Sequence, residues 1–219
     1  MEEEDVAKVE LNPKKVKKRP FYRFFKRSVD IVGSGAGLVL LSPLFGYLAY
    51  KVHKEDGGSV FYSQERVGKD GKKFKIYKFR SMVPNADQMV EELEDQNEID
   101  GAMFKIKDDP RVTKIGHVIR KYSLDELPQL WNVLIGNMTL VGPRPPLPSE
   151  VEEYSDYDKL RLTVKPGCTG LWQVTKRNEA DFDEMVELDI EYINHSGFFY
   201  DLGLIVRTIG VMIHPNGAY

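Results

Sequence analysis

Asp125 and Glu126 are adjacent carboxylates, and they are the side chains with the clearest capacity for chemistry in this 219-residue chain. Pro128 follows them, and proline is favoured in the first turn of a helix, where its missing N–H needs no partner. The apolar residues that come next recur at helical spacing until Gly136, which marks a stop. The sequence therefore predicts a helix whose N-terminal end carries both acids.

Two interpretations of this pair follow from the residues. Ser123 and Glu126 match the spacing of a capping box, in which the acids would serve only the helix end. Alternatively, the unpaired N–H groups and positive dipole of the helix end would attract phosphate and keep Asp125 ionised, as a nucleophile requires. Adjacent carboxylates also suit Mg2+, which binds through one or two carboxylates together with substrate phosphates.

Cationic side chains are candidates for holding phosphate near the pair. Arg120 precedes Asp125 closely enough to clamp a phosphate that the carboxylate attacks, and Arg144 lies in a stiff, proline-rich turn after the predicted helix. Lys78 and Arg80 lie at the end of a strand-like segment, where they are either solvated charges or phosphate ligands.

Residues 31–50 contain no charged side chain, and as one straight helix they would be about 30 Å long, enough to cross a bilayer. Ser42 and Pro43 interrupt this segment, because a proline inside a helix removes a backbone hydrogen bond and kinks the helix. Basic residues flank both ends, so both ends prefer the cytoplasmic side. The pattern favours a re-entrant hairpin, with a bent transmembrane helix as the alternative.

The chain before this segment is basic and carries interleaved aromatic residues at positions 21–25. Aromatic residues beside a basic run favour a membrane interface over nucleic acid as the partner. The glycines at positions 33–37 resemble a dinucleotide loop, but no predicted strand precedes them. We interpret them as a surface for close helix packing.

The rest of the chain has the pattern of mixed helices and short strands. Residues 59–82 predict a β-hairpin, and residues 150–162 predict a charged helix. Residues 166–174 predict a glycine-punctuated loop that leads into a short strand. Residues 198–213 are apolar apart from two charges, which predicts an amphipathic helix at a membrane interface.

Length and composition fit a single domain of ordinary size, and the one cysteine, Cys168, excludes an internal disulfide. We predict an α+β fold with a flexible charged tail (residues 1–20), a re-entrant membrane helix (21–54) and a compact, cytosol-facing catalytic domain (55–219). A small β-hairpin and interfacial amphipathic helices would surround the active site.

Four segments resemble motifs of the bacterial sugar transferases, in particular the small monotopic phosphoglycosyl transferases. They are KFRSM at residues 78–82, RKYSLDELPQLWNVLIGNMTLVGPRP at 120–145, PGCTGLWQV at 166–174 and LDIEYI at 188–193. The resemblance extends over residues 20–213, with the motifs in the same order.

The resemblance implies transfer of a sugar-1-phosphate from a UDP-sugar to undecaprenyl phosphate at the cytoplasmic face of the bacterial inner membrane. Asp125 would be the nucleophile and form a covalent phosphosugar intermediate with release of UMP, which predicts ping-pong kinetics. Mg2+ would be held by Asp125 and Glu126. The reaction would be the first membrane step of exopolysaccharide, capsule or glycoconjugate assembly.

The resemblance also implies roles for other residues. Phosphate or nucleotide would be held by five cations: Lys78, Arg80, Arg120, Arg144 and Arg177. Pro143 and Pro145 would shape the loop that bears Arg144, and Ser42 and Pro43 would form the kink of the membrane helix. Membrane lipids and downstream glycosyltransferases are the expected partners, without nucleic acid, and a homodimer stays open. Two other functions also stay open: a metal-dependent sugar-nucleotide phosphohydrolase and an inactive membrane scaffold.

Overall fold

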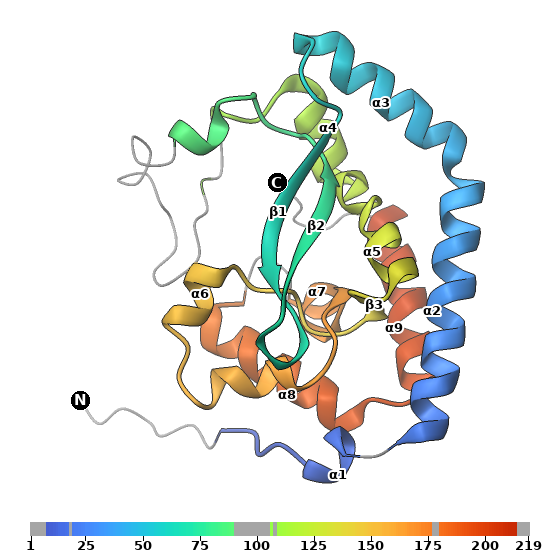
Figure 1. Cartoon of the computed structure of the whole chain (residues 1–219), viewed down its shortest axis with the longest axis vertical. Coiled ribbons are helices and arrows are strands. Elements are labelled where there is room, and N and C mark those ends of the chain that lie inside the picture. The colour runs from blue at the N-terminus through green and yellow to red at the C-terminus, as the bar shows by residue number, and fades with distance from the viewer. Residues whose placement is uncertain (1–7, 18, 90–105, 107–108, 177–179, 214–219) are drawn as a thin grey trace.

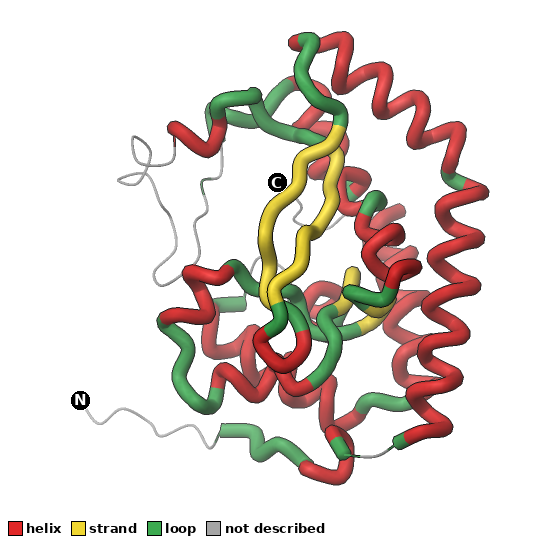
Figure 2. The backbone as a smooth tube through the Cα atoms, in the orientation of Figure 1, coloured by secondary structure: helices red, strands yellow, loops and turns green. Residues whose placement is uncertain are grey.

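Helices dominate the structure, and two small sheets lie among them, which confirms the predicted mixture (Figure 1, Figure 2). Helices α2 (Pro20–Leu40) and α3 (Ser42–Asp56) form a long, bent arm along one side of the molecule (Figure 1). The computed structural model describes residues 8–17, 19–89, 106, 109–176 and 180–213.

The arm bends by 60° where α2 gives way to α3, at the predicted kink. Pro43 has no N–H to donate to Val39 O, and Ser42 Oγ donates to that carbonyl at 2.8 Å instead. The side chain thus replaces the missing backbone bond. Within the described residues no single helix is both long and apolar enough to cross a bilayer; the bent pair meets that criterion only when both arms are counted.

Glycines allow α2 to lie close to its neighbours. A Cβ atom at Gly33 would lie 2.9 Å from Leu140 Cδ1, and one at Gly37 would lie 3.0 Å from Leu130 Cδ1, in helix α5 (Gln129–Ile135). The interpretation of these glycines as a packing surface is therefore confirmed.

Arg27 of α2 caps the C-terminal end of α5. Its two terminal nitrogens donate to Val133 O at 2.6 Å and Leu134 O at 2.7 Å, and Lys165 donates to Gly136 O at 2.7 Å. Cations are stabilising at this end of a helix, where carbonyls lack partners and the dipole is negative. These contacts fix the short helix that follows the predicted carboxylate pair.

Strands β1 (Phe61–Val67) and β2 (Lys73–Phe79) form the predicted antiparallel hairpin, which turns through η1 (Lys69–Gly71). Asn132 of α5 joins the hairpin to that helix: it accepts from Tyr77 N at 3.1 Å and donates to Lys75 O at 2.7 Å. Since Asn132 is fully buried, these bonds fix the position of β2 against α5.

Strands β3 (Thr139–Val141) and β4 (Gly167–Thr169) form a second, parallel pair. A Cβ atom on Gly167 would lie 2.1 Å from Gly142 N, so only glycine allows the two chains to approach this closely. The short strand was predicted to follow a loop over residues 166–174, but the strand of this stretch, β4, lies inside it. Helix α7 (Leu171–Thr175) follows instead, because a helical turn buries Leu171 in the core formed with α8 and α9.

The charged helix predicted over residues 150–162 is divided into α6 (Pro148–Glu152) and the 3-10 helix η5 (Asp158–Thr163). Asp158 Oδ2 accepts from both the backbone N and the hydroxyl of Ser155, at 2.8 and 2.7 Å. Local side-chain bonds of this kind compete with helical backbone bonds, which explains the interruption.

Helix α9 (Phe198–Ile213) has the predicted bounds and lies beside α2 (Figure 1). Asp201 of α9 accepts from Lys26 Nζ at 2.7 Å and from Tyr22 OH at 2.8 Å, so largely buried polar contacts hold α9 against α2. The other described elements are α1 (Pro13–Val16), η2 (Ala86–Met89), α4 (Lys114–Lys121), η4 (Leu124–Glu126) and α8 (Phe182–His195).

Candidate active site

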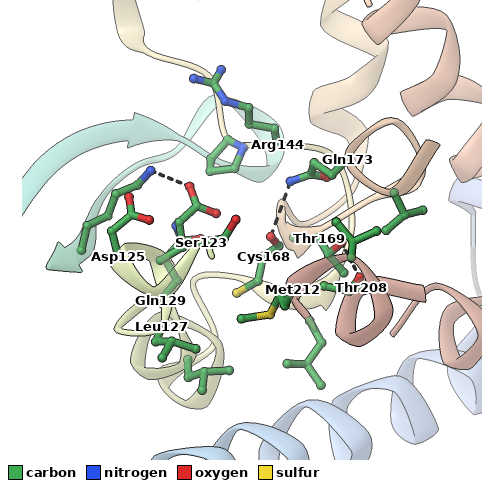
Figure 3. Close-up of a pocket in the computed structure, with 18 of the residues that line it drawn as sticks. Ser123, Asp125, Leu127, Gln129, Arg144, Cys168, Thr169, Gln173, Thr208 and Met212 are labelled. Atoms are coloured by element: carbon green, nitrogen blue, oxygen red, sulfur yellow. Dashed lines mark hydrogen bonds and ion pairs between the residues drawn. The ribbon is translucent and has the colours of Figure 1, made fainter. Parts of the chain in front are cut away.

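A cavity of about 470 Å3 lies between the hairpin, α5, β4, α7 and α9 (Figure 3). One wall carries the predicted carboxylates together with four cations: Arg66, Lys78, Arg120 and Arg144. The opposite wall is formed by α9 and is largely apolar, with Ile205, Ile209, Val211 and Met212. The cavity therefore combines a charged end with an apolar one.

Asp125 and Glu126 lie in the 3-10 turn η4, directly before α5. Ser123, in the left-handed conformation at φ 54°, makes no side-chain cap bond to this turn, so the capping-box interpretation is wrong. Pro128 occupies the N-cap position of α5 instead of its first turn. The tight turn aims the two carboxylates toward the cavity, and Figure 3 shows Asp125 there beside Ser123.

Asp125 is only 9% exposed. Burial raises the pKa of Asp125 to about 6; Lys78 and Arg120 lower it, while Glu126 raises it further. The helix end does not lower this pKa, because loss of solvent outweighs the favourable charges. Asp125 still remains mainly ionised at neutral pH.

Glu126 has the opposite behaviour. Burial disfavours its charge, yet Lys78 Nζ lies 2.6 Å from Glu126 Oε1, and Lys78, Arg144 and Arg66 together lower its pKa. The side chain is 40% exposed, toward the cavity that it lines. The pair thus consists of a firmly ionised Glu126 and a more basic Asp125.

The loop that bears Arg144 is held by the hairpin. Arg66 donates to Pro145 O at 3.1 Å, and Val67 N donates to Pro146 O at 2.9 Å. Arg144 itself lies 3.4 Å from Glu150 Oε1. Pro145 lines the cavity, so the loop-shaping prolines predicted from the sequence lie in the loop that places the Arg144 guanidinium near the carboxylates.

Arg66 is a site residue that the sequence interpretation missed. Arg66 lies among charged residues of β1, a pattern that is typical of a solvated strand edge. Its side chain is nevertheless buried, since the residue is only 8% exposed. Burial, with Arg144 adding to the effect, lowers the pKa of Arg66 to about 10. Its Nε has no hydrogen-bond partner among the described residues, so this buried donor is available to a ligand.

Trp172 and Gln173 were also missed, although the motif that contains them was recognised. Both line the cavity, and Trp172 Nε1 and Gln173 Oε1 have no partner among the described residues. Gln173 Nε2 lies 3.5 Å from Cys168 O (Figure 3). Burial raises the pKa of the Cys168 thiol, so we assign it no nucleophilic role.

Arg80 does not line the cavity, contrary to the prediction. Its guanidinium donates to both oxygens of Asp56 at 2.5 Å and also to Ser59 O at 2.6 Å, and it is only 6% exposed. Strand β2 ends at Phe79, so Arg80 leaves the face that Lys78 occupies and ties the end of α3 to the hairpin. Arg177 lies outside the described residues.

Few side chains near the cavity could act as ligands to a metal ion. Among the described residues no cluster of three or more His, Cys, Asp or Glu side chains could hold a metal ion. Asp125 and Glu126 supply two carboxylates, and Mg2+ commonly binds to one or two carboxylates with substrate phosphates as further ligands. The pair therefore fits Mg2+ when a diphosphate completes its coordination.

Paired carboxylates, neighbouring cations and an apolar wall are together suited to phosphate chemistry on an amphiphilic substrate. The family model described as bacterial sugar transferase matches residues 21–215, and the chain belongs to this family.

Three relatives illustrate the match. The galactosyl transferase CpsE of Streptococcus agalactiae serotype III is 47% identical over 203 residues, 90% of this chain and 45% of its own length. The undecaprenyl-phosphate galactose phosphotransferase of Salmonella typhimurium is 48% identical over 201 residues, 90% and 42%. The exopolysaccharide production protein ExoY of Rhizobium meliloti is 41% identical over 205 residues, 92% and 91%. The chain thus spans less than half of the first two relatives.

Proposed function

We propose that this chain transfers a sugar-1-phosphate from a UDP-sugar to undecaprenyl phosphate. The observation that carries the proposal is the buried, ionisable Asp125, which shares one cavity with Lys78, Arg120 and Arg144 and faces an apolar wall. The names of the relatives agree, since the Salmonella protein is named for galactose phosphate transfer to undecaprenyl phosphate.

In the first step, an Asp125 carboxylate oxygen attacks the β-phosphorus of the UDP-sugar. A P–O bond forms to Asp125, and the bond from the β-phosphorus to the bridging oxygen breaks, so UMP leaves with the electron pair. Arg120 and Arg144 neutralise the phosphates, and Lys78 screens Glu126, which would otherwise repel them. The more basic carboxylate of the pair is the better nucleophile, which favours Asp125.

In the second step, an oxygen of undecaprenyl phosphate attacks the phosphorus held on Asp125. The new phosphoanhydride bond releases the Asp125 carboxylate and gives undecaprenyl diphosphate-sugar. Covalent catalysis divides one transfer into two easier ones. Asp125 and Glu126 would hold Mg2+, which would offset negative charge on the diphosphate when bound.

We also propose that α2 and α3 enter and leave one leaflet as a re-entrant hairpin. The outer surfaces of α2 and α9 support this placement, because large apolar side chains are exposed there, including Phe21 (81%), Val39 (72%) and Phe199 (83%). Helix α9 contributes both to this outer surface and to the cavity wall, so a lipid acceptor can approach from the bilayer. The expected location is the cytoplasmic face of the bacterial inner membrane, with glycosyltransferases acting on the product.

The test is incubation of purified chain with a panel of UDP-sugars, Mg2+ and undecaprenyl phosphate, with separation of all products. Equal amounts of UMP and undecaprenyl diphosphate-sugar are expected. Sugar-1-phosphate formed at the same rate without lipid would favour the phosphohydrolase, and no turnover with any donor would favour the scaffold. The Asp125→Asn variant provides the blank.

A further inference from the structure

A second cavity, of about 340 Å3, lies behind the catalytic one. Strand β3 separates the two: Leu140 lines the catalytic cavity, whereas Thr139 and Val141 line the second. This division follows from the alternation of side chains along a strand. The other walls of the second cavity come from the α1–α2 corner, residues 163–165 and the end of α8.

This second cavity carries a large excess of positive charge. Seven lysine and arginine side chains line it, and Asp30 is the one carboxylate among its described lining residues. Asp30 is already occupied, since its Oδ1 accepts from Thr139 Oγ1 at 2.9 Å and from Leu140 N at 2.8 Å. Two of the cations, Lys26 and Lys69, pair with acids elsewhere.

The other five cations donate to neutral oxygens and have no carboxylate partner among the described residues. They are Lys15, Arg19, Arg23, Arg27 and Lys165, which contact carbonyl groups or the Ser196 hydroxyl. An ammonium has three N–H donors and a guanidinium has five, so each keeps unused donors. The cavity therefore offers unused N–H donors and positive charge to an anion.

The behaviour of Lys165 agrees with this charge excess. Its pKa is lowered, first by burial and then by the nearby charges of Arg27 and Lys69, with Asp30 opposing. A bound anion would relieve this repulsion.

The surroundings indicate what kind of anion fits. Apolar side chains, including Val16, Val164 and Ile193, line the same cavity. The first turns of α2, which supply Arg23 and directly follow Arg19, also expose Phe21 and Phe24. The cavity is lined by positive charges, and exposed aromatic rings lie beside it. This combination suits an amphiphile whose phosphate group enters the cavity.

We propose that this second cavity binds the phosphate group of an anionic phospholipid, separately from the substrates. The choice of a lipid over a free phosphate rests on the membrane placement given under the proposed function. The lipid phosphate would bridge Arg23 of α2 and Lys165 beside β4, and so join the membrane arm to the domain that bears the catalytic turn.

The experiment titrates the full chain, in neutral detergent, with phosphatidylglycerol or phosphatidylcholine and counts bound lipid by native mass spectrometry. Phosphatidylglycerol should bind at least about tenfold more tightly than phosphatidylcholine, because it carries a net negative charge and each nearby cation strengthens the binding of an anionic lipid. Arg23→Gln combined with Lys165→Gln should abolish this preference. Arg23→Gln alone, which leaves the cap on α5 intact, should reduce it and guards against loss of folding.

The matched control is Lys51→Gln combined with Lys54→Gln, which removes the same charge from α3 and should keep the preference. Equal lipid binding by the pocket and control variants would overturn the proposal. A site that binds inorganic phosphate through Arg23 and Lys165, with no preference between the two lipids, would overturn the lipid assignment. The Asp125→Asn variant should keep the preference for phosphatidylglycerol although it cannot transfer sugar phosphate. A failure of the proposed transfer can therefore be distinguished from a failure of the proposed lipid binding.

Discussion

Lys78 Nζ lies 2.6 Å from Glu126 Oε1 and so connects the hairpin to the catalytic turn. The contact gives the two adjacent carboxylates different properties, because it favours ionisation of Glu126 while Asp125 is left more buried and more basic. The position of Lys78 depends in turn on Asn132, which fixes β2 against α5.

Replacing Lys78 by methionine should raise the pKa of both carboxylates. Lys78 lowers each of them, so its removal moves the acid limb of the pH–rate profile to higher pH and lowers kcat by about tenfold or more. The measurement is kcat against pH with a fixed donor. Lys75→Met, on the same strand, is the matched control and should leave the profile in place.

Replacing Arg66 by lysine should weaken donor binding more than it slows turnover. Arg66 uses one terminal nitrogen for Pro145 O and the other for Gln64 Oε1, which leaves Nε for the cavity. Lysine keeps the charge but has all its donors on a single nitrogen, so it cannot reach these separate positions at once. We expect KM for the UDP-sugar to rise by about tenfold, since a charged hydrogen bond contributes roughly 1.5–3 kcal/mol. A fall in kcat with unchanged KM would argue against this positioning role.

Replacing Arg80 by lysine should lower stability and leave catalysis almost unchanged. Arg80 binds both oxygens of Asp56, which lowers the pKa of Asp56 to about 2. A depressed pKa adds stability that is present above the unfolded value near 4 and is lost as the pH falls toward 2. The melting temperature of the variant should therefore fall at pH 7. If the variant is fully folded and its KM for the UDP-sugar still rises strongly, Arg80 would be a phosphate ligand after all.

Replacing Pro43 by alanine should straighten the arm, because the backbone N–H of the new alanine could bond to Val39 O and the Ser42 hydroxyl would no longer be needed there. A straightened arm would move one end of the hairpin to the other side of the bilayer. The measurement is the accessibility, in sealed vesicles, of cysteines introduced one at a time at Lys8 and Lys69 after Cys168→Ala has removed the native thiol. Gly46→Ala, which meets open space on α3, is the control and should keep both sites on one side.

Replacing Asp125 by asparagine should stabilise the fold while abolishing transfer. Folding raises the pKa of Asp125 from the ordinary value of 3.8 to about 6, so burial of the charged form begins to cost stability as the pH rises through about 4 and costs it in full above about 6. The gain from Asn should be roughly 3 kcal/mol at pH 8, since each pKa unit corresponds to about 1.4 kcal/mol, and should vanish below about pH 4. Thermal unfolding of both proteins across this range checks the sign.

The sequence was informative where a local rule determines the structure. Ser42 and Pro43 predicted the bend because proline cannot donate to the carbonyl four residues earlier, and no distant contact alters that fact. The hairpin followed from alternation around a glycine-containing turn. Asp125, Arg120 and Arg144 were found because they lie close together in the chain or in a motif.

Tertiary contacts account for the differences. Arg66 and Arg80 lie in similar charged strand segments, yet one lines the cavity and the other binds Asp56, and their neighbours in sequence do not reveal this. The pKa of Asp125 depends on burial by elements that are distant in sequence, including β2. The division of the helix predicted over residues 150–162 has a local cause instead, because the hydrogen bonds from Ser155 to Asp158 compete with the helical backbone bonds.

The most direct test of the central claim is intact-mass analysis of the purified chain with Mg2+ and UDP-sugars in the absence of lipid. We expect a mass gain of one phosphosugar, located on Asp125 and discharged by undecaprenyl phosphate. If no donor gives an adduct while UMP appears as soon as lipid is added, transfer is direct between the two substrates, and Asp125 is not the nucleophile.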